Sequence, residues 1–384
     1  MRRPHPRVGS TLERTLLSKH GGSATRTLAS YLTPYYRAML PRAFEAAIPS
    51  ETAADCAHCP MQRGAAEEER EGFFFTDKTR CCTHYPNIPN YLVGALLSSK
   101  GRPCAEGRRR VEEIIKAGVG VTPQGIRRPG RYELLLKNSV PDAFGRSEAL
   151  VCPLLDTEAG KCTIWPYLEA ACNTWFCKHA AGLDGRLFWL AVREYLEGLQ
   201  TVIVQHVLLE MGWDPRAIVL KQAPRGLAAE DLDSRRPAGY ERLWDNWAGC
   251  EAAFYVHAHT IASGLARADI TRLGGVEMRL LLEAVQAARR DMLDKTLPDP
   301  LVRSPSLQVK PGAQDSYILV GYSPIDPVEV SERAYPVLDF FDGLRPNEEA
   351  CRKALEQLGA KPTKGFLLMA YRFRILEPAA HPKE

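Results

Sequence analysis

The chain has 384 residues, of which 45% are hydrophobic and 25% are charged, a composition typical of globular proteins. At roughly 100–200 residues per domain, this length predicts two or three domains with ample material for a core. The 50 basic and 46 acidic residues give a net charge of +4, so we expect no nucleic-acid partner. No apolar run approaches the roughly 20 residues of a membrane span, so we expect no membrane partner either.

The N-terminal segment is strongly basic. Six basic residues and one acidic residue fall between Arg2 and Arg26. This pattern is typical of a basic arm or a transit peptide, and because no apolar signal core follows, it predicts a cytoplasmic protein. Apolar residues at helical spacing predict a helix over 22–48, kinked or split at Pro34. Residues 1–49 are therefore expected to form a basic arm and a helix.

Eight of the eleven cysteines fall between residues 56 and 177. A Cys-x-x-Cys pair opens the series, and this spacing lets two thiolates converge on one ion because the chain can reverse between them. Eight thiols can supply two four-sulfur sites, and thiolates favour zinc and iron–sulfur clusters over hard cations. The predicted metal ligands are Cys56, Cys59, Cys81, Cys82, Cys152, Cys162, Cys172 and Cys177. Spacing does not separate a zinc site from a [4Fe–4S] cluster, so both cofactors stay open.

Disulfides are the alternative role for these cysteines. We do not expect them, because the cysteine count is odd and a chain of this size can bury a core without them. The adjacent Cys81 and Cys82 could bond to each other only with strain. Three histidines lie beside these thiols and are expected to donate hydrogen bonds to ligands, to be exposed to solvent or to complete a mixed site. They are His58, His84 and His179.

Residues 50–180 are thus predicted to form a metal-binding domain of irregular, cysteine-rich loops. Within it, the run at 131–137 is interpreted as a strand. The three remaining cysteines are isolated in the sequence and are expected to be small buried apolar residues. They are Cys104, Cys250 and Cys351.

Residues 181–297 are predicted to form a helical domain. A long amphipathic helix should begin at an Asp184 cap and end at Gly212. Two further helices are expected at about 239–262 and 275–295. A Leu-Pro-Asp-Pro sequence then breaks the last helix and predicts a domain boundary.

Residues 305–380 change character. Strands at 306–309 and 316–320 should form a hairpin, and a short strand should end the segment. Three helices are expected between them, beginning near Ser331, Asn347 and Thr363. This order is typical of a winged helix. The predicted fold class is therefore mainly α with irregular cysteine-rich metal-binding loops, followed by a C-terminal α+β winged-helix domain.

The cysteine region resembles a known family. The runs Cys152–Leu155 and Gly160–Trp165, with Cys172 ten residues after Cys162, are similar to the YkgJ-type cysteine cluster, described as zinc- or iron-chelating. The resemblance implies a leading pair and a double cysteine, which here are Cys56 with Cys59 and Cys81 with Cys82. The chain departs from the family pattern in the long spacing between these two pairs and at Leu168, Glu169 and Asn173.

The same signature occurs in flagellin lysine N-methylases, which are thought to use an iron–sulfur centre. This resemblance implies an alternative function, a protein- or peptide-modifying enzyme with a catalytic cluster. The sequence shows no glycine-rich nucleotide loop and no Cys-x3-Cys-x2-Cys loop for radical chemistry, so catalytic residues are not assigned. A zinc-stabilised scaffold without chemistry is a third interpretation.

The C-terminal segment resembles a second family. The run Val337–Arg345 and the closing Ile375–Glu377 are similar to PqqD-like domains, small winged domains that bind leader peptides. This resemblance implies a peptide or protein partner bound through residues 305–380. Residues 305–384 carry ten basic and eleven acidic residues, a net charge of −1, whereas a duplex-binding domain normally has a basic excess. The expected function is a YkgJ-like metalloprotein with a C-terminal recognition domain.

Overall fold

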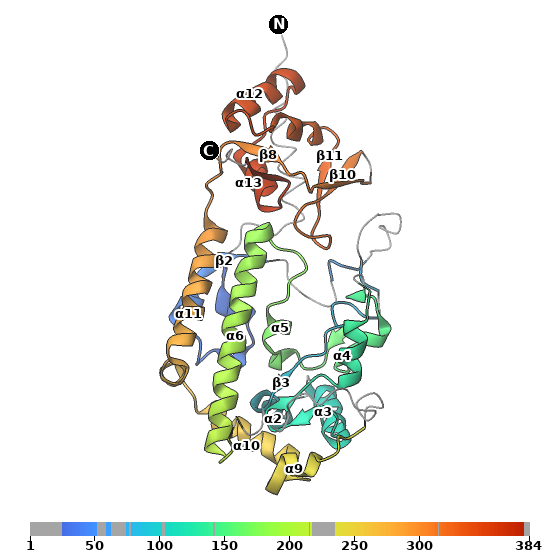
Figure 1. Cartoon of the computed structure of the whole chain (residues 1–384), viewed down its shortest axis with the longest axis vertical. Coiled ribbons are helices and arrows are strands. Elements are labelled where there is room, and N and C mark those ends of the chain that lie inside the picture. The colour runs from blue at the N-terminus through green and yellow to red at the C-terminus, as the bar shows by residue number, and fades with distance from the viewer. Residues whose placement is uncertain are drawn as a thin grey trace.

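The computed structural model describes residues 25–51, 59–62, 74–76, 78–101, 104–140, 143–214, 216, 235–313 and 315–379. Its centre is a pair of long helices, α6 (Gly182–Glu210) and α11 (Arg267–Leu293), which lie side by side (Figure 1). Shorter helices and small sheets lie beside this pair, and the C-terminal elements lie at its upper end. The described residues are thus mainly helical with small antiparallel sheets, as the sequence predicted.

The N-terminal segment is not the predicted helix. Over the described part of 22–48, strand β1 (Thr25–Thr27) pairs antiparallel with β2 (Ala47–Pro49). Three short 3-10 turns lie between them, η1 (Leu28–Tyr31), η2 (Pro34–Tyr36) and η3 (Arg42–Glu45). The prediction was wrong because prolines at 34 and 41 each remove a backbone donor, so only single turns can form between them. Each of the three turns instead buries one apolar side chain, Leu28, Tyr36 or Phe44.

The cysteine region consists of short elements. Strands β3 (Ile88–Pro89), β5 (Gly125–Ile126) and β4 (Val121–Thr122) form a small antiparallel sheet in that order. The helices are α2 (Asn90–Ser98), α3 (Ala105–Ala117), α4 (Gly130–Lys137) and the four-residue α5 (Ala170–Asn173). The hairpin β6 (Leu155–Asp156) and β7 (Lys161–Cys162) lies between the 3-10 turns η7 (Glu148–Leu150) and η8 (Trp165–Tyr167).

Helix α4 corrects the strand predicted at 131–137. The run contains arginine, glutamate, three leucines and lysine, all of which favour helices, and it has no β-branched residue. A short apolar run does not distinguish strand from helix by its spacing, so residue type decides here.

The helices of residues 181–297 differ from the prediction at their ends. Ala181, not Asp184, is the cap of α6, and Asp184 lies in the first turn. The helix expected at 239–262 is divided into α9 (Tyr240–Trp244), η9 (Asp245–Trp247) and α10 (Glu251–Ser263), with Gly249 at φ +81 between the last two. Helix α11 begins earlier than predicted and contains a kink at Gly275.

Two antiparallel pairings organise the C-terminal elements. Strands β9 (Gln308–Pro311), β10 (Ser316–Val320) and β11 (Val328–Ser331) form one sheet with β10 at its centre. Strand β8 (Leu301–Arg303) pairs with the terminal β12 (Leu376–Pro378). The turn η10 (Tyr335–Phe340) and helices α12 (Asn347–Leu358) and α13 (Lys364–Arg372) lie between β11 and β12 in the sequence.

The buried apolar residues fall into two clusters. One extends from Leu28 to Met292 and contains residues of the N-terminal segment, the cysteine region and the helices of 181–297. The other extends from Leu301 to Leu376. Arg372 joins the two parts, because its guanidinium lies 3.7 Å from the carboxylate of Asp184 and donates to the carbonyl of Met292 at 2.6 Å. These contacts also show that α6 and α11 are antiparallel. Among the described residues, no helix is long and apolar enough to cross a membrane.

Candidate metal centre

Seven of the eight predicted ligand cysteines line one cavity of about 170 Å³. They are Cys59, Cys81, Cys82, Cys152, Cys162, Cys172 and Cys177. The eighth, Cys56, lies outside the described residues, as does His58. None of the cysteines that the structure describes forms a disulfide. The three isolated cysteines are absent from the lining, and of these Cys250 is exposed rather than buried as expected.

Backbone hydrogen bonds bring the double cysteine to the later thiols. The amide of Cys152 donates to the carbonyl of Cys82 at 2.7 Å, and the amide of Leu155 donates to the carbonyl of Cys152 at 3.0 Å. Leu155 then pairs with Cys162 across the β6–β7 hairpin. These contacts bring Cys82, Cys152 and Cys162 to one cavity although they lie far apart in the sequence.

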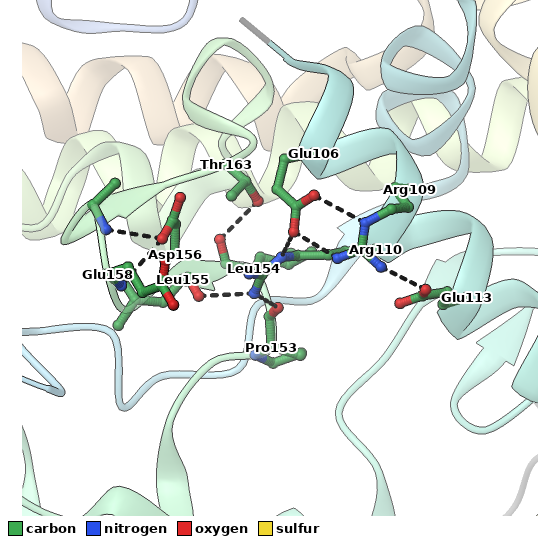
Figure 2. Close-up of polar contacts among 11 residues, drawn as sticks. Glu106, Arg109, Arg110, Glu113, Pro153, Leu154, Leu155, Asp156, Glu158 and Thr163 are labelled. Carbon is green, nitrogen blue, oxygen red and sulfur yellow. Dashed lines mark hydrogen bonds and ion pairs between the residues drawn. The ribbon is translucent and has the colours of Figure 1, made fainter.

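Arg110 holds this hairpin against helix α3 (Figure 2). Its Nη1 donates to the carbonyl of Pro153 at 2.7 Å and to that of Leu155 at 2.8 Å. Its Nε donates to Oε1 of Glu106 at 2.6 Å, one turn earlier on the same helix. Because a guanidinium presents several donors in a fixed plane, one side chain can fix both carbonyls at once. Arg110 therefore positions the segment that follows Cys152.

The segment that carries the double cysteine is fixed from two sides. The amide of Gly145 donates to Oγ1 of Thr83 at 2.7 Å, and the hydroxyl of Thr79 donates to the carbonyl of Gly145. The hydroxyl of Tyr132 donates to the carbonyl of Thr83 and accepts from the amide of Tyr85 at 3.0 Å. These bonds lie on both sides of residues 81 and 82 in the sequence, so the two thiols are held by buried backbone contacts.

Glu169 places Cys172 and lies beside it. Its carboxylate caps α5 by accepting from the amide of Ala171 at 2.8 Å and from the amide of Cys172 at 2.9 Å. Nε2 of His84 lies 3.6 Å from Oε1 of Glu169. Ligand atoms of His84, Glu169 and Cys172 all lie within 4.8 Å of one another. Burial acts to raise the pKa of Glu169, but His84 and the two amides outweigh it and lower this pKa, so the buried carboxyl is ionised.

Burial dominates the electrostatics of most of the thiols. It raises the pKa of Cys152 to about 12 and that of Cys177 to about 12. It also raises the pKa of Cys172 well above the usual value, with Glu169 adding to the effect. A thiol that must lose its proton in such surroundings needs a compensating positive charge, which a bound metal would supply.

Cys81 differs from the other thiols of the cavity. The hydrogen bond that it shares with Cys82 lowers the pKa of Cys81 and raises that of Cys82. The guanidinium of Arg80, also in the cavity lining, adds to the lowering at Cys81. Nε and Nη1 of Arg80 are buried and have no hydrogen-bond partner within the described part of the chain. Donors of this kind are suited to a thiolate or an inorganic sulfide.

Two partly exposed tryptophans also line the cavity, Trp165 at 50% and Trp175 at 39% of full exposure. The indole of Trp175 donates to Sγ of Cys177 at 3.4 Å. The cavity therefore reaches the protein surface beside aromatic side chains.

The chain immediately after Cys177 binds the C-terminal part. Nζ of Lys178 donates to the carbonyl of Ile325 at 2.6 Å. The amide of His179 donates to Oδ2 of Asp326 at 3.0 Å, and the same carboxylate accepts from the hydroxyl of Tyr322. Nδ1 of His179 lies 3.2 Å from that hydroxyl. His179 thus contacts the β10–β11 connection.

Glu51 supports the same segment from the N-terminal side. Its carboxylate accepts from the amide of Ala180 at 2.7 Å and from the indole of Trp189 at 3.0 Å. Burial raises its pKa.

Four residues that support the cavity were not predicted from the sequence: Glu51, Arg80, Arg110 and Glu169. Only Glu169 left a local signal, an acidic residue three positions before a ligand cysteine, which is the spacing of a helix cap.

No family model matches the chain, and no curated protein or solved structure matches it significantly. The residues of the cavity are therefore the evidence for function.

Proposed function

We propose that the chain is a metalloprotein that holds a metal–thiolate centre in the cysteine-lined cavity. One observation carries the proposal: seven thiols from distant parts of the sequence line the same 170 Å³ space. Buried thiols do not need to gather in order to pack a core, whereas soft metal centres require them together as thiolates. Arg80, with its buried unpartnered donors, adds positive charge at the same place.

Within this proposal we favour an iron–sulfur cluster over a single zinc ion. Four Zn–S bonds of about 2.3 Å in a tetrahedron place the sulfurs only about 3.8 Å apart. No three thiols of the described residues lie within 4.8 Å of one another. A [4Fe–4S] centre, in which each thiolate binds a different iron, accepts thiols that lie farther apart than this. One cluster needs four thiolates, and the candidates are the seven lining cysteines together with Cys56.

Anaerobic purification with metal and sulfide analysis tests this function. We expect a brown protein with broad visible absorbance and nearly equal amounts of iron and acid-labile sulfide. A colourless protein with stoichiometric zinc would support the zinc-stabilised scaffold instead. A protein that binds neither metal after anaerobic reconstitution would overturn the proposal.

A catalytic role is the second candidate, as in the lysine N-methylases that the motifs resemble. The exposed indoles of Trp165 and Trp175 favour it, because they line the cavity and give a substrate side chain a route to it. The measurement is turnover of protein or peptide lysines by the loaded protein with candidate methyl donors. Trp165→Ala should then lower turnover while the cluster absorbance is retained.

We further propose that residues 305–380 form a winged-helix module that binds an extended peptide. Strand β10 is not available for such a peptide, because it is the central strand and its backbone is paired on both sides. Strand β9 lies at the edge of this sheet and is mostly exposed, so it can accept a further strand. In a peptide-library screen with the full chain, Val309→Pro should abolish binding by removing a backbone donor of this strand.

A further inference from the structure

We propose that His84, Glu169 and Cys172 form a separate site for one borderline divalent cation, zinc or ferrous iron, with a fourth coordination position left open. The inference rests on the proposed function, since it assigns one thiol of the cavity to a second kind of centre. Within the described residues, this is the only group of three such ligand side chains whose ligand atoms all lie within 4.8 Å of one another. It combines a nitrogen, an oxygen and a sulfur ligand, a set that zinc and ferrous iron accept.

The spacing of His84 and Glu169 fits two ligands of one ion. Their closest atoms, Nε2 and Oε1, lie 3.6 Å apart, which is too long for a hydrogen bond. Two ligands on one tetrahedral zinc, with bonds of about 2.1 Å, lie about 3.4 Å apart. A small movement of side chains would therefore close the site around an ion. An ion pair between His84 and Glu169 is the alternative to a metal site, and titration of His84→Gln with Zn²⁺ separates the two.

The surroundings of Glu169 also fix its carboxylate in a position to bind a metal ion. Only 5% of the residue is exposed, and the two backbone amides of the α5 cap hold both carboxylate oxygens in place. Each oxygen uses one lone pair in these bonds and keeps another for a metal. Apart from His84, no basic side chain forms an ion pair with this carboxylate among the described residues.

The assignment leaves the sulfur-only centre complete. Without Cys172, six described thiols still line the cavity, more than the four that one iron–sulfur cluster needs. The two centres would then differ in chemistry. Three protein ligands and one open position are typical of catalytic zinc, whereas structural zinc has four protein ligands. The open position would take water or an oxygen or nitrogen atom of a bound molecule.

The test uses the full chain, purified anaerobically and titrated with Zn²⁺ or Co²⁺ alone. We expect one equivalent of ion beyond the iron of the cluster, and Co²⁺ should give the visible bands of a tetrahedral site. His84→Gln should weaken this binding by more than about 100-fold, because loss of an outer partner alone costs only 10–100-fold. Glu169→Gln should do the same, and both variants should keep the cluster absorbance.

Cys162→Ser is the matched control, because it removes a thiol of the same cavity that lies outside the three-residue group. It should weaken the cluster and leave the extra equivalent bound. Because Glu169 also caps α5, His84→Gln is the deciding variant. The inference is overturned if His84→Gln binds Zn²⁺ like the unaltered protein, if it loses the cluster, or if the loaded protein takes up no extra ion. A chain that binds no metal of any kind overturns the proposed function as well.

Discussion

The guanidinium of Arg110 donates to the carbonyl of Pro153 over 2.7 Å and so joins helix α3 to the residue after Cys152. This contact crosses 43 positions of the chain, and it connects a regular helix to an irregular loop. Thiol positions in this protein therefore depend on polar contacts to neighbouring helices as well as on the loops themselves.

Replacing Arg110 with Gln should weaken the centre without touching a ligand. The variant loses two hydrogen bonds from a charged donor to backbone carbonyls, each worth about 1.5–3 kcal/mol. We expect a lower free energy of unfolding in chemical denaturation and less metal retained per chain. Arg109→Gln is the control, because Arg109 lies on the same helix and shares Glu106 with Arg110, but among the described residues it donates to no carbonyl of the hairpin. Equal effects of the two changes would contradict the positioning role.

Cys81 and Cys82 should both be ligands. Both thiols line the cavity and share a hydrogen bond, so they lie close enough to bind two irons of one cluster or two neighbouring ions. Serine at either position should lower the bound metal measured by elemental analysis. Cys250→Ser is the comparison, because that thiol is exposed and outside the cavity. If both single variants kept their full metal content, these residues would leave the ligand set.

Metal removal should destabilise the part of the chain that carries the thiols. Binding to the folded state alone contributes about 4 kcal/mol at a thousandfold excess over the dissociation constant. For a folded unit of about 150–250 residues, each kcal/mol shifts the melting temperature by about 2–4 °C, so the expected fall is about 8–16 °C. Calorimetry before and after anaerobic chelation measures the change. An identical melting curve for the metal-free protein would show that the centre does not support the fold.

The sequence predicted which thiols gather but not what holds them. Cysteine spacing and the Cys152 and Cys162 motifs led to seven residues that do line one cavity. Arg110 and Glu51 were missed because their contacts join positions 43 to 138 residues apart, and no local pattern records such a contact. Helix α12 was predicted with its correct start at Asn347. Helix α4 and the N-terminal turns were predicted wrongly, because apolar spacing alone neither separates a short helix from a strand nor accounts for the backbone donors that two prolines remove.

Asp326 should make the connection between the two parts of the chain sensitive to acid. Burial acts to raise its pKa, but hydrogen bonds from His179 and Tyr322 and the charge of Lys178 outweigh burial and lower it. Since the folded pKa lies below the unfolded value of about 3.9, the carboxylate contributes its full stability above about pH 4. That contribution is lost as the pH falls through the folded pKa.

Asp326→Asn should therefore lower the free energy of unfolding by about 1–3 kcal/mol at neutral pH, the cost of a buried charge-assisted hydrogen bond. Its difference from the unaltered protein should shrink below about pH 4, because Asp326 is then protonated. Amide exchange at 178–180 should quicken in the variant, since the amide of His179 loses a charged acceptor. Asp339→Asn is the control, because that carboxylate is 59% exposed and pairs with Arg303 away from this contact. A stability difference that does not change with pH would show that the charge of Asp326 does not stabilise this connection.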